Sequence, residues 1–239
     1  MWDNHALLRS IANTLITFSA LAILYGAIYY TVHLPNLFPI HSVRLSAAPE
    51  KVVAEHVLQV VRHEVRGNFF TVDIDRIRRS VESLPWVRNA SIRREFPNKL
   101  IMELEEHQTL ARWNSGALVN QQGEIFVGSE RVMPAVDSRV LPSFSGSDDT
   151  SLEVTQRYAQ FNRQLAEIGL TVTHIALSAR HAWHLKLSND IVLELGRDNV
   201  EQRLERFVSV YPYSLARMQS GARYVDLRYS NGFAVSVKS

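Results

Sequence analysis

The chain contains no cysteine among its 239 residues. Disulfide bonds are therefore excluded, and so are metal sites that depend on thiolate ligands. Lysine and arginine form no run, and the 26 basic residues nearly balance the 24 acidic ones, which leaves a formal net charge of +2. Because nucleic-acid binding depends on clustered cations, this charge pattern argues against a DNA- or RNA-binding protein.

One long segment near the N-terminus lacks charge altogether. No Lys, Arg, Asp or Glu occurs between Arg9 and Arg44. A hydrocarbon core ~30 Å thick requires roughly 20 mostly apolar residues in a helix, and residues 11–33 satisfy that length. Tyr29 and Tyr30 suit the aromatic belt at the outer end of such a helix. We predict a transmembrane helix over residues 11–33 that tethers the rest of the chain to one face of a membrane.

The alternative is a cleaved signal peptide, since Ala20-Leu21-Ala22 resembles a cleavage site. Cleavage there would leave the apolar stretch 23–32 at the new N-terminus. The uncharged segment also exceeds the ~7–15 apolar residues of a signal peptide, so we favour an uncleaved anchor. Lys and Arg near the ends of a transmembrane helix favour the cytoplasmic side. Here Arg9 is the only such residue before Arg44, so charge alone only weakly favours an N-terminus inside the cell.

The segment after the anchor alternates between helical and strand patterns. Residues 41–45 can form a strand, and the valines of 53–61 have the spacing of one helix face. A second helix follows, with Asp73 as its N-cap, and Pro85 ends it. Alternating apolar residues then predict two strands around residues 97–99. The predicted order of this unit is β-α-α-β-β.

Strand patterns dominate the second half of the sequence. The predicted strands cover residues 117–120, 124–127, 170–177, 183–187, 191–195, 224–229 and 233–237. Thr150 and Glu153 resemble a capping box that opens a helix, and residues 200–211 contain another helical face. We predict a mostly antiparallel β domain with flanking helices, and thus an α+β protein behind a single N-terminal transmembrane helix.

Residues that could support catalysis are scattered along the chain. His181 and His184 have an H-x-x-H spacing, but on a strand that spacing directs the two rings to opposite faces. The loop at 145–149 lacks the strand-turn-helix context of a nucleophile elbow. Neither a dinucleotide-binding glycine motif nor a Walker A motif occurs. We therefore predict no catalytic residue, no metal, no cofactor and no small-molecule substrate.

The last strand, residues 233–237, is a better candidate for function. Its sequence FAVSV is followed by Lys238 and has few of the charges that normally protect a sheet edge. At an edge, it could accept a partner strand by β-augmentation. An interior position, or a covering neighbour, is equally compatible with the pattern.

Several motifs resemble a known family. Those at 67–73 (GNFFTVD), 84–90 (LPWVRNA) and 93–98 (RREFPN) resemble a polypeptide-transport-associated (POTRA) domain. Those at 105–108 (EEHQ), 111–113 (ARW), 118–120 (LVN), 123–126 (GEIF) and 224–229 (YVDLRY) are similar to the FtsQ/DivIB family of bacterial cell-division proteins. The resemblance extends over the whole chain, including the anchor.

This resemblance implies a domain organisation and a location. The implied parts are a cytoplasmic tail (1–10), a transmembrane helix (11–33), a juxtamembrane linker (34–39), a POTRA domain (40–106) and a β domain (107–239). Members of the family are single-pass type II proteins of the bacterial inner membrane, with both domains in the periplasm and enriched at the division septum. They are non-enzymatic scaffolds of the divisome.

The resemblance also implies partners. FtsB and FtsL would join the chain in a trimeric subcomplex that links early to late division proteins controlling septal peptidoglycan synthesis. The β domain would bind FtsB at its C-terminal edge. The residues implied in that contact are Arg180, Arg228, Tyr229, Gly232, Phe233, Val235 and Val237.

Two of these roles have structural alternatives. Tyr229 and Phe233 would be aromatic anchors, and the two arginines would set register and partner choice by charge pairing. However, Tyr229 could instead be a core aromatic, and Arg228 could be a solvated side chain. Val237 stands where the family can have an aromatic residue, so that contact would be smaller here.

Two other functions remain as alternatives. The first is a POTRA-bearing component of an envelope protein secretion or assembly machine, which would be expected to contain several POTRA units or a following barrel. The second is a metal-dependent periplasmic hydrolase that uses His181 and His184.

Overall fold

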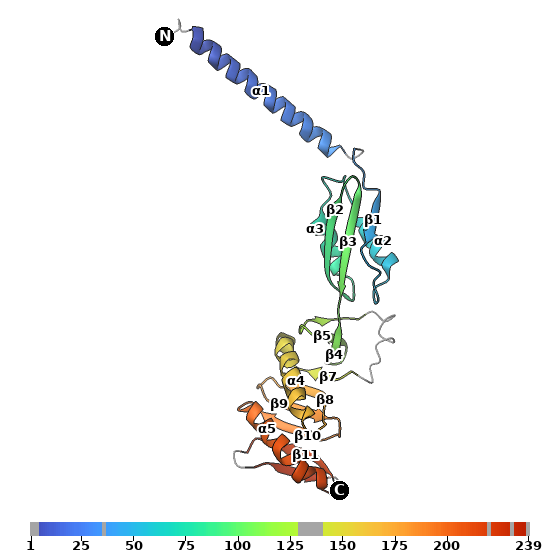
Figure 1. Cartoon of the computed structure of the whole chain (residues 1–239), viewed down its shortest axis with the longest axis vertical. Helices are drawn as coiled ribbons and strands as arrows, with labels where there is room; N and C mark the ends of the chain where they lie inside the picture. Colours follow the sequence, from blue (N-terminus) through green and yellow to red (C-terminus); the bar gives the residue numbers. More distant parts are fainter. Residues whose placement is uncertain (1–4, 35–36, 129–140, 219–220, 230–231, 238–239) are drawn as a thin grey trace. The chain divides into compact units, whose positions relative to one another are not determined.

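The computed structural model describes residues 5–34, 37–128, 141–218, 221–229 and 232–237, and for residues 5 and 6 only the backbone (Figure 1). Its chain contacts divide it into two compact units, Met1–Glu106 and His107–Ser239.

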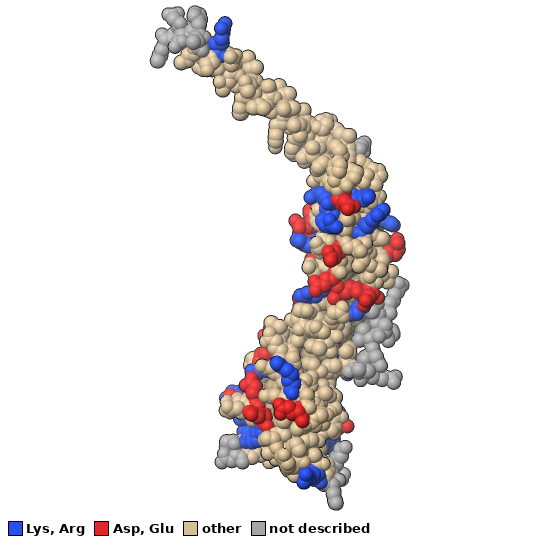
Figure 2. Space-filling view, in the orientation of Figure 1, with Lys and Arg blue, Asp and Glu red and all other residues tan. Residues whose placement is uncertain are grey.

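The first unit begins with one long helix, α1 (His5–His33). Its segment Leu7–His33 has a mean hydropathy of 1.8 and is long and apolar enough to cross a membrane. Figure 2 shows no charged side chains along α1 beyond its N-terminal end. Three threonines satisfy their hydroxyls internally by donating to carbonyls four residues earlier. The helix thus presents an apolar surface on all sides, as a membrane anchor does.

A three-stranded sheet and two helices form the rest of this unit. The elements are β1 (Ser42–Leu45), α2 (Ala54–Glu64), α3 (Ile74–Glu82), β2 (Val87–Glu95) and β3 (Lys99–Glu106). The strand order is β1-β3-β2, with β1 parallel and β2 antiparallel to the central β3. The predicted β-α-α-β-β order is confirmed.

The core of this unit lies between the helices and the sheet. Val57 and Val61, one turn apart on α2, are fully buried, as are Ile77 and Val81 on α3. They pack in one cluster with side chains of β3. Asp73 caps α3 by accepting a hydrogen bond from the Arg76 backbone N–H at 2.9 Å, as predicted.

The second unit is built on a long mixed sheet, whose order in the described residues is β12-β11-β10-β9-β8-β7-β4-β5-β6. Its strands are β4 (Thr109–Trp113), β5 (Ala117–Asn120), β6 (Ile125–Phe126), β7 (Ser143–Ser145), β8 (Val172–Leu177), β9 (Trp183–Leu187), β10 (Val192–Gly196), β11 (Ala222–Asp226) and β12 (Ala234–Val237). Five of the eight described pairings are antiparallel, and β7 with β4, β8 with β7, and β11 with β10 are parallel.

Two helices, α4 (Ser151–Ala166) and α5 (Val200–Val210), cover one face of this sheet (Figure 1). The 3₁₀ turn η2 (Asp148–Thr150) precedes α4, and η3 (Tyr211–Tyr213) and η4 (Leu215–Arg217) follow α5. Phe161 of α4 and Phe207 of α5 are fully buried in one apolar cluster with strand residues such as Leu185 and Leu193. The order of the strands decides which of them lie at the two ends of the sheet.

Three local predictions were wrong. The Thr150 hydroxyl donates to the Ser147 carbonyl at 2.7 Å rather than capping α4, because η2 occupies the position before the helix. His181 lies in the turn before β9 with φ 57°, so the argument from strand alternation does not apply to it. The penultimate strand ends at Asp226 rather than at Tyr229; Leu227 still donates its N–H to the Glu194 carbonyl at 2.9 Å, but the strand does not continue beyond it.

Candidate binding edge

The strand β12 lies at the end of the nine-stranded sheet. It pairs antiparallel with β11, with Val235 opposite Val225 and Ala234 opposite Asp226. No other described strand pairs with its outer side. The interior position that the sequence left open is therefore not the one adopted. An uncharged edge with free N–H and C=O groups can accept another strand.

Side chains alternate along this edge. Phe233 and Val235 pack against the core of the β domain, whereas Ala234 and Ser236 are exposed. Val237 is also exposed. A strand added beside β12 would meet an apolar row on one face and small side chains on the other.

Tyr229 belongs to the connection between β11 and β12. Its side chain is 59% exposed, so it is not a core aromatic. Gly232 lies on the same connection, and a Cβ there would meet no atom within 4 Å. The chain itself thus imposes no steric requirement for glycine at this position, and space remains beside the backbone.

Arg228 is exposed and ion-paired at the same time. Its guanidinium donates to both carboxylate oxygens of Asp226, with Nε–Oδ1 at 2.9 Å and Nη2–Oδ2 at 2.7 Å. These hydrogen bonds hold the pKa of the buried Asp226 below its usual value and raise the pKa of Arg228. A partner carboxylate would therefore share a guanidinium that is already oriented.

Two arginines of α5 donate hydrogen bonds to the segment that connects β11 to β12. Arg203 donates to the carbonyls of Leu195 (2.7 Å) and Arg228 (3.1 Å). Arg206 donates to the carbonyl of Tyr229 at 3.1 Å. Sequence reasoning missed both residues, because two arginines three positions apart on an amphipathic helix are normally a solvated face. Only the tertiary structure shows that they bind backbone carbonyls, which pre-orders the hairpin before any partner binds.

Gly196 makes room for this arrangement. Its φ of +69° favours glycine, and a Cβ there would lie 3.0 Å from Arg203 Nη1 and 3.2 Å from Arg228 Cγ. Both arginine side chains therefore pack directly over its backbone.

A polar network lies across the strands beside this edge. The buried Glu194 of β10 has His184 Nδ1 at 2.6 Å and accepts a weak hydrogen bond from the Tyr224 hydroxyl at 3.4 Å. Burial, followed by the nearby charges of Glu194 and Asp226, raises the pKa of Tyr224. Glu194 also lies opposite Asp226 in the register of β10 and β11. The network joins the strand that carries Asp226 to the interior strands of the sheet.

Arg180 lies in the turn between β8 and β9, and its side chain is exposed. The register places Leu177 opposite Trp183, and Trp183 opposite Gly196. The Arg228 side chain packs over the backbone of Gly196, at the end of β10. The turn that carries Arg180 and the residue Arg228 therefore lie at the same end of the sheet. The two predicted cations are thus on one end of one sheet, two strands apart.

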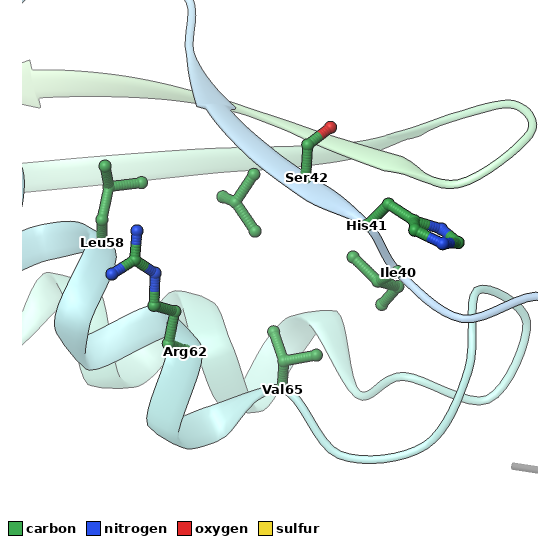
Figure 3. Close-up of a pocket in the computed structure, with 7 residues that line it drawn as sticks. Ile40, His41, Ser42, Leu58, Arg62 and Val65 are labelled. Atoms are coloured by element: carbon green, nitrogen blue, oxygen red, sulfur yellow. The ribbon is translucent and has the colours of Figure 1, made fainter. Parts of the chain in front are cut away.

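The first unit also contains a pocket of about 400 Å³. It lies between β1 and α2, where Ile40, Val65 and the Arg62 side chain face it (Figure 3). It opens widely to solvent. Within the described residues, no group of three or more His, Asp or Glu is placed to hold a metal ion. His41 and Ser42 also line the pocket, but their side chains point in different directions (Figure 3), and His41 Nδ1 lies 3.0 Å from the Pro39 carbonyl and 3.1 Å from Asn98 Nδ2. The two residues therefore do not form the nucleophile–base pair of an active site.

An apolar span-length helix, a small α/β unit and a sheet with an open edge define a class of anchored, non-catalytic binding proteins. Comparison with protein families agrees with this class. Residues 38–107 match the family described as "POTRA domain, FtsQ-type", and residues 111–228 match "Cell division protein FtsQ/DivIB, C-terminal".

Curated relatives extend the match to the whole chain. It is 41% identical to "Cell division protein FtsQ" of Nitrosospira multiformis, over 98% of both chains. It is 37% identical to the protein of that name from Burkholderia pseudomallei (98% and 94% of the two chains) and 34% identical to that from Coxiella burnetii (98% and 96%). The chain belongs to the FtsQ/DivIB family of cell-division proteins, which are non-enzymatic. The alternative of an envelope hydrolase at His181 and His184 is therefore wrong.

Proposed function

We propose that the chain is a membrane-anchored scaffold of the divisome that binds FtsB and FtsL through the C-terminal edge of its β domain. In this role it links early to late division proteins that control septal peptidoglycan synthesis. The observation that carries the proposal is the uncharged edge strand β12 (Ala234–Val237), which has one strand neighbour and a braced connection to β11.

We propose for this chain the membrane topology that the FtsQ/DivIB family implies. A tail at residues 1–10 lies in the cytoplasm, the helix at 11–33 crosses the inner membrane, and the linker at 34–39 leads to a periplasmic POTRA domain (40–106) and β domain (107–239). The apolar length of α1 and the division of the contacts at Glu106 support these boundaries. The protein is enriched at the septum in this proposal.

At the edge, an FtsB segment adds as a further strand beside β12, and backbone hydrogen bonds supply much of the adhesion. Tyr229 is the exposed aromatic anchor, while Phe233 and Val235 support the strand from the core side and Val237 offers an exposed apolar contact. Arg180 and Arg228 select acidic residues of the partner. Because Asp226 already orients Arg228, little side-chain entropy is lost when the partner binds.

The first test uses the exposed anchor. Tyr229→Ala in the full-length chain should weaken capture of the purified FtsB–FtsL complex by roughly 30-fold, the effect of a hot-spot residue worth about 2 kcal/mol. Tyr213→Ala is the matched control, since Tyr213 is 76% exposed and lies on η3. Deleting residues 229–239 should abolish capture while the POTRA unit keeps its fold. Undiminished capture by the truncated chain would refute the proposal.

The second test addresses the backbone. N–H groups alternate in direction along a strand, so the pair Ala234 and Ser236 points to one side and the pair Val235 and Val237 to the other. Proline removes the N–H donor. One pair of proline variants should therefore weaken FtsB–FtsL capture without loosening the hairpin, and the other should loosen the hairpin itself. Equal effects of both pairs would argue against strand addition.

A further inference from the structure

Three separate segments of the first unit form an exposed aromatic cluster, which comprises Phe38, Phe69, Phe70 and Phe96. Phe69 is its buried centre, and its ring contacts Phe70 and Phe96 edge to face at centroid distances of 5.3 and 6.2 Å. Phe38 meets Phe70 at 5.1 Å. The three outer rings are 43%, 45% and 74% exposed for Phe38, Phe70 and Phe96. Large apolar side chains that converge on one exposed surface mark an interaction site.

Hydrogen bonds attach this aromatic cluster to the end of α1. The fully buried side-chain amide of Asn68 donates to the carbonyls of Val32 (2.6 Å) and Leu34 (3.0 Å), at the last turn of the helix. The Asn68 side-chain oxygen accepts from the N–H of Phe70 at 2.9 Å. The loop that carries Phe69 and Phe70 is therefore held at the helix C-terminus, next to carbonyls that have no partner within the helix.

Phe38 reaches the same place along the chain. Phe38 lies four positions beyond Leu34, so even an extended chain keeps it within roughly 14 Å of Leu34. Its φ of 61° is rare for a bulky side chain, and the Phe69 N–H holds it there by donating to the Phe38 carbonyl at 2.9 Å. The strained backbone at Phe38 thus accompanies the contact between the Phe38 and Phe70 rings.

Basic residues lie within the segments that carry the aromatic cluster, and acidic residues border them. Residues 34–41, 65–72 and 96–99 include Arg66 and Lys99, while Glu64, Asp73 and Glu95 lie directly next to these segments, with Glu64 paired to Arg76. Figure 2 shows several Lys and Arg side chains, with Asp or Glu side chains among them, at this end of the POTRA domain. Aromatic rings with flanking cations are the composition that proteins place at the level of anionic lipid headgroups.

We propose that the aromatic cluster is a second membrane anchor, which inserts the rings of Phe38, Phe70 and Phe96 into the headgroup region of the bilayer that α1 spans. Arg66 and Lys99 lie at the lipid phosphates. The occupant is lipid because the cluster begins five positions beyond the proposed membrane-spanning helix, which ends at His33, and is hydrogen-bonded to its end. This inference rests on the proposed topology of α1. The second attachment restricts rotation of the POTRA domain about the end of the helix.

Site-directed spin labelling tests this directly, because the chain has no native cysteine. Single cysteines replace Phe96 or Phe70 in the full-length chain, which is reconstituted in vesicles of phosphatidylethanolamine and phosphatidylglycerol. Phe96→Cys and Phe70→Cys labels should collide with apolar oxygen several-fold more, and with an aqueous nickel complex several-fold less, than a Tyr213→Cys label on the β domain. Replacing Arg66 and Lys99 with glutamine should reduce this difference.

A fourth label separates the two proposals. A Phe18→Cys label in the middle of α1 reports whether the helix itself is in the bilayer. If that label is in hydrocarbon while the Phe96 and Phe70 labels are as water-accessible as Tyr213→Cys, the second anchor is refuted and the span stands. If the Phe96 and Phe70 labels are shielded from both reagents, the cluster is covered by protein, which also refutes lipid insertion. A water-exposed Phe18 label would instead refute the topology.

Discussion

Asn68 offers a sharp test of how the helix end is joined to the first folded domain. Its side chain is fully buried, and its amide group donates to the carbonyls of Val32 and Leu34. Its oxygen accepts from the backbone N–H groups of Phe70 and Thr71 at 2.9 and 3.0 Å. Asn68→Asp keeps the acceptor for the loop and the volume of the side chain, but it removes both donors.

The magnitude follows from these contacts. Each lost hydrogen bond contributes about 0.5–1.5 kcal/mol net, so the two together are worth about 1–3 kcal/mol. The cost rises further because a buried carboxylate would face two carbonyl oxygens. The loop 67–71 should keep its local turn, since its own hydrogen bonds survive the substitution. The expected result is therefore a loosened junction within an otherwise folded domain.

Hydrogen exchange of the full-length chain in detergent provides the assay. Amides in residues 31–38 should exchange roughly 5- to 150-fold faster in Asn68→Asp, which corresponds to the loss of 1–3 kcal/mol. Asn89→Asp is the matched control, because Asn89 is exposed on β2. Unchanged exchange in residues 31–38 of the Asn68 variant would show that the amide does not hold the helix end, and would refute this reasoning.

Three further predictions concern the β domain. Phe161→Ala leaves a cavity at a fully buried site and should lower the free energy of unfolding of this domain by about 3–5 kcal/mol, seen as a lower urea midpoint for this domain alone. A decrease of less than about 1 kcal/mol would contradict the place of Phe161 in the core. Burial, followed by the nearby charge of Lys186, lowers the pKa of His174 from 6.5, so the unfolded state binds more protons and stability decreases as pH falls through that value. In His174→Gln the melting temperature should therefore depend less on pH between about pH 7 and 5. An unchanged dependence would contradict this. Arg206→Gln should speed amide exchange in residues 222–237 and weaken FtsB–FtsL capture, whereas Arg217→Gln, on η4, should change neither; equal behaviour of the two variants would refute the bracing role.

Patterns that depend on near neighbours in the chain were predictable. The uncharged segment that ends before Arg44, the cap at Asp73 and the strand pair around residues 97–99 each follow from local spacing, and the structure contains the corresponding elements. The capping box at Thr150 failed for the opposite reason. The 3₁₀ turn η2 lies directly before α4 and replaces the local cap. Trp113, 35 residues earlier in the chain, donates from Nε1 to Asp148 of this turn at 2.7 Å, a contact that local spacing does not reveal.

The binding edge was only partly predictable. An apolar, uncharged terminal strand indicated either an edge or an interior strand, because strand periodicity reports faces and says nothing of neighbours. The parallel pairing of β11 with β10, made possible by the crossover through α5, leaves β12 at the end of the sheet. The partner of Arg228 was likewise invisible in the sequence, since a solvated arginine and an ion-paired arginine share the same pattern.

The sequence by itself therefore determined the anchor, the β-α-α-β-β order of the first unit and the family, because hydropathy and periodicity act over a few turns of chain. It missed β4 and β7 of the second unit. The tertiary structure alone decided which strand edge is open, that α5 arginines brace the hairpin, and that Asn68 ties a loop to the helix end 36 residues earlier. Those features depend on which distant segments meet. A hydrogen-bond donor has the same sequence pattern whether its acceptor is water or a carbonyl brought close by folding.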